Sequence, residues 1–379
     1  MLISHPSIMW THSSTWTNIE SALCAFLSLF PKVLVSATMT WGLWAIYTQS
    51  HSIPEPWGSV AIAVAAVLYG LSIFAYFRVI YDGPGSPSDY PELRCAPQPD
   101  PEHYGRSPYD TGDYAHPYTL ETPRATIPPT EIYSSHTFRD NQPTYKSCHV
   151  CNTWKPDRCH HCNSCKRCVL KMDHHCPWFA TCIGYKNHKY FIQSLCYITS
   201  FCGLLLLLSG YELYRFFADQ EFDLHSYLSL NLVFVFVLSF TFYVAVGIFS
   251  AFSVYLMVRN YSTIEFQDSR WNYSGDDAQY EFDSNGKRKK LGHLYDLGIK
   301  KNIRAVMGDT WAAWLLPIRV TTESLSAGTR NGVHFEINED VYEKMCTNAK
   351  LQAQLNRQLA EYRERTHHGN GTQQQQDIV

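Results

Sequence analysis

The chain has little net charge for its size, which narrows the classes of protein it can belong to. Its 379 residues carry 31 Lys and Arg against 34 Asp and Glu, a formal net charge of -3. This balance provides no global basic surface, so we expect no nucleic-acid partner. The N-terminus also lacks a basic segment before its first apolar stretch, and we therefore expect no removable signal peptide.

Four long apolar stretches contain almost no ionisable side chains. Each is long enough to cross a bilayer, for which a helix needs about 20 apolar residues. They lie at 25–47, 57–80, 191–214 and 228–258. The first is the weakest, because Pro31 and Lys32 interrupt it. We predict an α-helical multi-pass membrane protein with four transmembrane helices; a channel or transporter would normally carry ionisable groups within its spans.

Basic residues are absent from two short connections between these stretches. The loops 49–56 and 218–226 contain no Lys or Arg, whereas 78–189 holds 13 and the region from Arg259 onward holds 16. Cytoplasmic loops of membrane proteins carry the excess of Lys and Arg, so we predict that both termini are cytoplasmic. Disulfides rarely persist in the cytosol, and cysteines on this side are expected to bind metal or to take part in catalysis.

Six regions follow from this pattern. They are a cytoplasmic N-terminus (1–24), transmembrane helices one and two (25–81), a cytoplasmic connection (82–145), a cysteine-rich zinc domain (146–190), transmembrane helices three and four (191–258) and a cytoplasmic C-terminal region (259–379). The connection is rich in Pro, Gly and Tyr, which predicts an irregular backbone without regular secondary structure. The bilayer is therefore an expected partner, and the zinc domain lies between helices two and three.

The C-terminal region contains three further patterns. Aromatic and aliphatic side chains at 311–318, after a cap at Asp309 or Thr310, suit a helix in the membrane interface. The stretch 339–365 is helix-prone with apolar residues on one face, and it either packs on a neighbour or forms a coiled coil with a partner. The basic run 287–290 is a solvated loop or a contact for anionic lipid.

Cysteine is concentrated in the middle of the chain. Seven of the 13 cysteines lie between Cys148 and Cys176, and an eighth is Cys182. Each C-x2-C pair can bring two thiolates to one tetrahedral metal and is a typical half of a zinc site. Eight candidate ligands are present: Cys148, Cys151, His161, Cys162, Cys165, Cys168, His175 and Cys182. They suffice for two closed structural zinc sites and leave His174 and Cys176 over.

Cys176 closely follows an aspartate and a histidine, Asp173 and His174. Residues two apart lie on one side of an extended segment, and Pro177 disfavours a helical conformation at Cys176. The imidazole of His174 can then take the thiol proton, and Asp173 can orient the ring. From these residues alone, the cluster is a catalytic triad, a third metal site or a buried structural cysteine.

This segment, inside the cysteine pattern, resembles the motif of the DHHC protein S-acyltransferase family. The resemblance continues through Lys155-Pro156, Arg158, Pro177-Trp178, Gly184, Asn187 and Phe191, and outside the zinc domain through Asp82-Gly83-Pro84-Gly85, Ser262-Thr263-Ile264-Glu265, Leu297-Gly298 and Asn302. It covers roughly residues 25–320. Thr181 and Ser262 depart from it, because many members have Asn and Thr at these positions.

The resemblance implies a role for each residue of the motif. Cys176 would be the acyl-accepting nucleophile, His174 its base and Asp173 the orienting acid. One zinc ion would bind Cys148, Cys151, His161 and Cys168, and the other Cys162, Cys165, His175 and Cys182. Cys159 lies outside this scheme, as an inert buried thiol or a secondary acylation site.

The implied reaction is protein S-palmitoylation with acyl-CoA as co-substrate. A long-chain acyl group would pass from acyl-CoA through Cys176 to cytoplasmic cysteines of membrane-associated proteins, with palmitate as the typical chain. We expect the acyl chain among the four spans. Four basic residues are candidates for the phosphates of coenzyme A: Arg158, Lys166, Arg167 and Lys171.

Several short segments are most similar to the fungal vacuolar-membrane branch of the family. They include Gly83-Pro-Gly-Ser-Pro87 and Trp154-Lys-Pro-Asp-Arg158. We therefore expect the vacuole membrane as the location, with the ER or Golgi membrane as the alternative. A different class of function is a membrane-anchored zinc-finger scaffold in which every cysteine is structural, and the leftover Cys176 argues against it.

Overall fold

The computed structural model describes most of the chain except its N-terminus and most of the long connection before the cysteine-rich segment. The described residues are 14–49, 53–54, 56–95, 128, 133, 135–136, 138–139, 142–143, 145–218, 228–271, 280–282, 285, 287–319 and 331–374. Much of the expected connection (82–145), the two short loops between spans and the end of the chain therefore lie outside the described residues.

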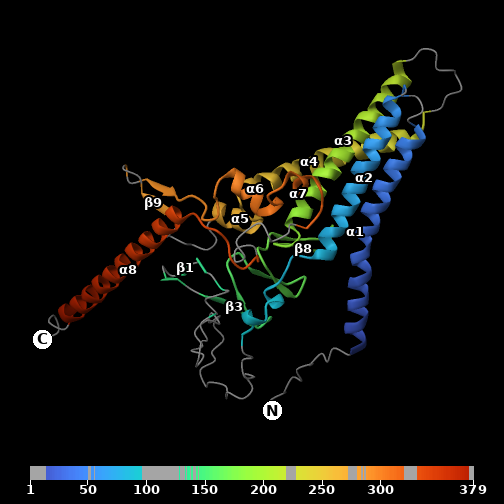
Figure 1. The fold of residues 1–379 in the computed structure, drawn as a ribbon. Helices are drawn as coiled ribbons and strands as arrows, with labels where there is room; N and C mark the ends of the chain where they lie inside the picture. Colours follow the sequence, from blue (N-terminus) through green and yellow to red (C-terminus); the bar gives the residue numbers. More distant parts are fainter. Residues whose placement is uncertain are drawn as a thin grey trace. The chain divides into compact units, whose positions relative to one another are not determined.

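Four long helices carry the apolar stretches. They are α1 (Ser14–Gln49), α2 (Trp57–Asp82), α3 (His188–Ala218) and α4 (Leu230–Val258), drawn in Figure 1. Their membrane-spanning parts are Phe26–Thr48, Trp57–Asp82, His188–Ala218 and Leu230–Val258. The predicted multi-pass helical fold with four spans is thus confirmed. Pro31 lies inside α1 without ending it, and this helix continues into the region expected as the N-terminal segment.

The chain divides into two compact units, and the first contains most of the four long helices. This unit comprises Met1–Tyr81, His175–Thr181 and Tyr190–Ala251. Each long helix contributes to its core through Met39, Ala45, Ile46, Ala65, Phe201, Leu205 and Val235. Small residues allow the helices to approach closely, since a Cβ atom on Gly203 would lie 2.9 Å from the ring of Tyr243.

The second unit contains most of the cysteine-rich segment, which forms a series of short hairpins. It comprises Asp82–His174, Cys182–Lys189 and Phe252–Val379. The paired strands are β3 (Lys146–Cys148) with β4 (Thr153–Lys155), β5 (His160–Cys162) with β6 (Arg167–Val169), and β7 (His174–Cys176) with β8 (Thr181–Ile183). A pair β1 (Phe138–Arg139) with β2 (Gln142–Pro143) precedes them. Hairpins this short are not stable in isolation, so further bonds must hold them.

The segment after α2 packs against the hairpins. It contains two 3-10 turns, η2 (Pro87–Asp89) and η3 (Pro91–Leu93). Backbone hydrogen bonds join Leu170 N to Gly85 O over 3.2 Å and Lys186 N to Pro84 O over 3.1 Å. Gly184 permits this contact, because a Cβ atom there would lie 2.6 Å from Val169 and 2.9 Å from Pro84.

The region after α4 consists of short helices, one hairpin and one long helix. The elements are α5 (Thr263–Trp271), β9 (Tyr280–Phe282), β10 (Arg288–Lys290), α6 (Ile299–Met307), α7 (Trp311–Leu315) and α8 (Glu339–Gln374). Thr310 caps α7 as expected, since its side chain accepts a hydrogen bond from Ala313 N.

Two expectations for this region need correction. The basic run 287–290 is not a plain loop, because Arg288–Lys290 forms β10 and pairs with β9. The apolar face of α8 packs on a neighbour only in its first turns, where Met345 and Ala349 are buried. Leu355, Leu359 and Tyr362 further along α8 are exposed. Periodicity identified the helix but did not show where its packing ends.

Candidate functional site

Strand β7 carries the residues expected to do chemistry. His174 and Cys176 are its first and last residues, so the backbone is extended through both, as predicted. Successive side chains of a strand point to opposite faces, which places His174 and Cys176 on one face and His175 on the other. Cys176 is buried, whereas His174 and His175 are partly exposed.

Asp173 divides its two carboxylate oxygens between two partners. Its Oδ2 lies 2.8 Å from Nδ1 of His174, and its Oδ1 accepts a 2.7 Å hydrogen bond from the backbone N–H of Thr263. Burial alone would raise the pKa of Asp173, but the bond to His174 and the Thr263 amide hold that pKa below its ordinary value. A carboxylate in this position favours the imidazole tautomer that has its proton on Nδ1 and leaves Nε2 open.

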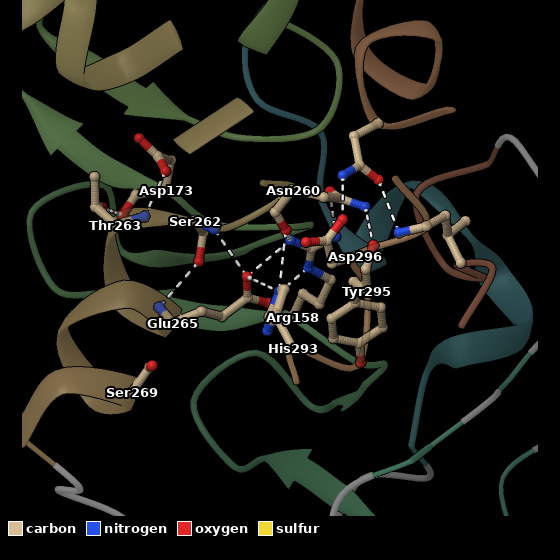
Figure 2. Close-up of polar contacts among 12 residues, drawn as sticks. Arg158, Asp173, Asn260, Ser262, Thr263, Glu265, Ser269, His293, Tyr295 and Asp296 are labelled. Atoms are coloured by element: carbon tan, nitrogen blue, oxygen red, sulfur yellow. Dashed lines mark hydrogen bonds and ion pairs between the residues drawn. The ribbon is translucent and has the colours of Figure 1, made fainter. Parts of the chain in front are cut away.

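Thr263 is held in place by the segment that follows α4. Its hydroxyl also donates a hydrogen bond to the backbone oxygen of Asp173, so two bonds join the residues. Glu265, two positions later, accepts a 2.8 Å bond from Ser262 N through Oε2 and fixes the start of α5. Figure 2 shows Thr263 and Ser262 side by side between Asp173 and Glu265.

Glu265 forms an ion pair with Arg158 inside the second unit. Arg158 Nε lies 2.6 Å from Oε1 of Glu265 and Nη2 lies 2.7 Å from Oε2, which is the bidentate arrangement of a strong pair. The Arg158 side chain is 1% exposed. Burial opposes ionisation of Glu265, but the charge of Arg158 outweighs it and lowers the pKa of Glu265 to about 2.

Asn260 and His293 extend this network, as Figure 2 shows. Arg158 Nη2 donates to the backbone oxygen of Asn260 over 2.7 Å, and Nη1 lies 3.1 Å from the Asn260 side-chain oxygen. His293 stacks on Tyr261 at 3.8 Å between ring centroids. Arg158 and Asn260 both have positive φ, at 65° and 52°. Such strained backbone persists where surrounding bonds fix it.

The first group of candidate metal ligands lies on the hairpins β3–β4 and β5–β6. It consists of Cys148, Cys151, His161 and Cys168, whose ligand atoms lie within 4.8 Å of one another. Nδ1 of His161 is 3.5 Å from the sulfur of Cys148 and 3.3 Å from that of Cys151. Three thiolates and one imidazole at this spacing fit a tetrahedral Zn²⁺, whose bonds to sulfur are about 2.3 Å long.

A second group has the same donor set. It consists of Cys162, Cys165, His175 and Cys182, again with ligand atoms within 4.8 Å of one another. The sulfurs of Cys165 and Cys182 are 3.4 Å apart. His175 belongs to this group because it points away from the face of β7 that carries His174 and Cys176. Both groups have four protein ligands, so neither leaves an open position for substrate.

Cys159 lies beside the first group but is not one of its ligands. It is buried and packs in one cluster with Cys148 and Cys168. Burial keeps this thiol away from solvent and from other reactants. This placement favours the expectation of a buried structural thiol over that of a secondary acylation site.

The turn after Cys176 rests on the end of α2 within the first unit. The hydroxyl of Tyr76 donates a 2.7 Å hydrogen bond to the backbone oxygen of Trp178. The ring of Tyr76 lies 4.8 Å from that of Phe179. No motif marks Tyr76 in the sequence, where its only signal is an aromatic side chain near the end of an apolar stretch.

Two of the four basic residues expected at coenzyme A phosphates are not available for that role. Arg158 is committed to Glu265 and Asn260, and Lys171 is buried. Burial also lowers the pKa of Lys171 to about 7. Lys166 and Arg167 are exposed, so the expectation stands for these two alone.

The first unit has a groove beside two of its long helices. A groove of about 970 Å³ lies between α1 and α2, lined by residues that include Lys32, Trp41, Trp44 and Phe77. Neither α3 nor α4 lines this groove, so it does not test the expectation of an acyl chain among the four spans. The position of the acyl chain therefore stays a prediction.

Comparison with known proteins places this site in a family. Residues 141–270 match the model of the DHHC palmitoyltransferase domain. Palmitoyltransferase PFA3 of Debaryomyces hansenii is 46% identical over 96% of this chain and 96% of its own length. Palmitoyltransferase PFA3 of Saccharomyces cerevisiae is 32% identical over 88% of this chain and 92% of its own length. Palmitoyltransferase ZDHHC2 of Rattus norvegicus is 30% identical over 76% of this chain and 72% of its own length.

Proposed function

This chain belongs to the DHHC palmitoyltransferase family and is a protein S-palmitoyltransferase of the membrane, and we propose that Cys176 carries the acyl group in its reaction. One observation carries the proposal. Strand β7 places His174 and Cys176 on one face while Asp173 holds Nδ1 of His174 at 2.8 Å. The unprotonated Nε2 can then accept the proton of the thiol, which is the role of the histidine in a Cys-His-Asp triad.

The proposed reaction has two steps. In the first, His174 takes the proton of Cys176, the thiolate attacks the thioester carbonyl of acyl-CoA, and a new thioester forms as coenzyme A leaves with a proton. In the second, His174 takes the proton of a substrate cysteine, the resulting thiolate attacks the acyl group on Cys176, and the proton passes to the departing sulfur of Cys176. An enzyme that passes through a covalent intermediate in this way shows ping-pong kinetics.

We propose that each of the two Cys/His groups holds one structural Zn²⁺. Cys148, Cys151, His161 and Cys168 would bind the first ion, and Cys162, Cys165, His175 and Cys182 the second. Zinc here would fold the hairpins around β7, since zinc sites with four protein ligands contribute folding energy. The ions take no part in the acyl transfer.

The substrates that we propose are membrane-associated proteins with cysteines on the cytoplasmic side, together with long-chain acyl-CoA. The concentration of Lys and Arg in 78–189 and after Arg259 supports cytoplasmic termini and a cytoplasmic site. Resemblance to the vacuolar branch supports the fungal vacuole membrane as the location. Fluorescence of a tagged chain on the ER or Golgi instead would contradict this location.

The deciding experiment labels the purified, zinc-loaded chain with a clickable palmitoyl-CoA analogue. We expect a label that hydroxylamine removes, as for any thioester, and that is absent from Cys176→Ser. The matched control is Cys159→Ser, which removes another buried thiol of the same segment and should keep the label. Label that persists in Cys176→Ser would refute Cys176 as the acceptor, and a folded wild type without label would favour the scaffold function.

A further inference from the structure

The segment 299–319, which contains α6 and α7, is tied to residues that end three of the membrane spans. Asn302 Nδ2 donates a 2.8 Å hydrogen bond to the oxygen of Val258, the last residue of α4. Lys189, in the first turn of α3, donates to Ile318 O over 2.7 Å. Arg319 lies 3.4 Å from the carboxylate of Asp82, the last residue of α2. These bonds join the segment to the end residues of three helices that carry membrane spans.

This segment exposes large apolar side chains near those helix ends. Trp311 of α7 is 75% exposed, Leu315 59% and Ile299 of α6 63%. A hydrogen bond of 2.7 Å from Trp314 Nε1 to Gly308 O fixes the turn between the helices. Apolar and aromatic residues of an amphipathic segment gain free energy when they enter the boundary between headgroups and acyl chains. Contact with lipid would therefore stabilise this apolar surface.

Positive charge accompanies the apolar residues. Helix α6 reads IKKNIRAVM and contains no acidic residue. Asn302 and Met307 face the protein, whereas Lys300, Lys301 and Arg304 are exposed. Among the residues that the structure describes, no hydrogen bond or ion pair involves the ammonium group of Lys300 or Lys301. Two lysines are thus available for an anion at the membrane surface.

The other basic run of the chain is engaged in bonds to its own unit. Lys290 Nζ donates to the oxygen of Ser269 and lies 2.9 Å from its hydroxyl. Lys289 lies 4.0 Å from the carboxylate of Glu281. The run 287–290, which the sequence had offered as a contact for anionic lipid, is therefore less suited to that role than α6.

We propose that Lys300 and Lys301 of α6 form a site for the headgroups of anionic phospholipids in the leaflet where α2 and α4 end and α3 begins. The apolar side chains of α6 and α7 enter the acyl boundary and the two ammonium groups bind the phosphates. The proposal concerns the lipid around the enzyme and not its acyl donor.

Native mass spectrometry of the purified full chain in detergent tests the proposal. The protein is titrated with phosphatidylglycerol or with phosphatidylcholine, and bound lipid is counted for wild type and for the double variant Lys300→Gln/Lys301→Gln. Each basic residue near an anionic membrane surface contributes about fivefold to binding. We expect phosphatidylglycerol binding to weaken about twentyfold to thirtyfold in the double variant while phosphatidylcholine binding is unchanged.

A matched pair of substitutions controls for net charge. Lys287→Gln/Lys289→Gln removes the same two charges from the other basic run and should leave phosphatidylglycerol binding at the wild-type level. Equal loss in both double variants, no loss in either, or no preference for phosphatidylglycerol in wild type would overturn the proposal. Displacement of the lipid by soluble glycerol phosphate would also overturn it, because a free phosphate site would then be present. Zinc content confirms that each variant is folded.

Discussion

The carboxylate of Asp173 contacts both His174 and Thr263. These contacts predict the effect of replacing it by an amide. In Asp173→Asn an amide replaces the oxygen that faces Nδ1 of His174, so the ring loses the charge that stabilises its imidazolium form. We expect the rate of Cys176 acylation to fall by roughly 10²–10⁴, the usual contribution of a positioned acid or base. Single-turnover labelling with acyl-CoA measures this rate.

The pH profile of the same variant separates this role from a structural one. If Asp173 acts through His174, raising the pH restores part of the lost rate, because hydroxide then forms the thiolate without the imidazole. A uniform loss at every pH, together with reduced zinc content, would show that Asp173 only supports the fold. Thr263→Val is the companion change, since it removes the hydroxyl that bonds to Asp173 O but keeps the amide that bonds to Oδ1.

Glu265 lies inside the second unit, so removing its charge should lower the free energy of unfolding. Removing one partner of a buried ion pair costs about 3–5 kcal/mol, because the other charge is left uncompensated. We expect Glu265→Gln to lower the free energy of unfolding by an amount of that order, since Arg158 stays buried. Thermal unfolding in detergent at pH 7, with Arg158→Lys as the variant that keeps the charge but loses the fork, measures the effect.

The pH dependence of this stability has a definite sign. The pKa of Glu265 falls from 4.5 to about 2 in the folded chain. Its contribution is therefore fully present above pH 4.5 and is lost as the pH falls from there toward 2. The difference in stability between wild type and Glu265→Gln should narrow across this window. A difference that stays constant down to pH 3 would mean that the carboxylate is not stabilised by Arg158.

At the scale of the element, the cysteine hairpins show what sequence can and cannot predict. All eight candidate ligands could be named from the sequence, and the C-x2-C pairs were the main signal, because two thiolates of such a pair can reach one metal. Spacing left the assignment of ligands to sites open, and the groups that the structure assembles interleave along the chain. That assignment depends on how hairpins pack, which is a property of contacts between distant residues.

The hairpins also predict the outcome of removing one ligand. Cys148→Ala takes one of four donors from the first group, so we expect the purified chain to lose about one of its two zinc ions and to become sensitive to chelators. Elemental analysis per mole of protein counts the ions. Cys159→Ala is the matched control, because this thiol is buried beside the same group and should leave the zinc content intact. Equal loss of zinc from both variants would make Cys159 a ligand.

The ion pair of Arg158 shows why the other contacts of the site could not be predicted from the sequence. A basic residue in a cysteine-rich segment is equally compatible with a phosphate contact and with a buried ion pair. Its partner Glu265 lies beyond the fourth span, and their separation of 107 residues hides the pairing from any local pattern. The same holds for Thr263 and Asp173, which are 90 residues apart and joined by two hydrogen bonds. Resemblance to a family marked these residues without showing their contacts.

For the whole molecule, the four spans were the most accessible feature, because length and apolarity alone identify them. The start of α3 was placed three residues late, at 191, since His188 and Lys189 are polar and yet belong to the helix. Their polarity is accommodated because both side chains are buried, with Lys189 bonded to Ile318 O. The mean hydropathy of a segment cannot show that Lys189 has a hydrogen-bond partner far along the chain.

The orientation of the whole molecule gives the last prediction. Basic residues predict that the loop 49–56 faces the side opposite to α8. Ser52→Cys and Gln354→Cys place one extra thiol in each of these parts, and a membrane-impermeant maleimide is applied to sealed vesicles that have the cytoplasmic face outward. We expect Gln354→Cys to gain label over wild type in intact vesicles, and Ser52→Cys to gain it only after detergent is added.

Each outcome of this labelling bears on where the chemistry takes place. The expected pattern puts α8, and with it the chain that leads from α4 to α8, in the compartment that supplies acyl-CoA. The reverse pattern would place the candidate zinc ligands in an oxidising lumen, where cysteines pair as disulfides and a thiolate nucleophile is not maintained. Because α2 ends and α3 begins on the side where α4 ends, the result for Gln354 also fixes the side of Cys176.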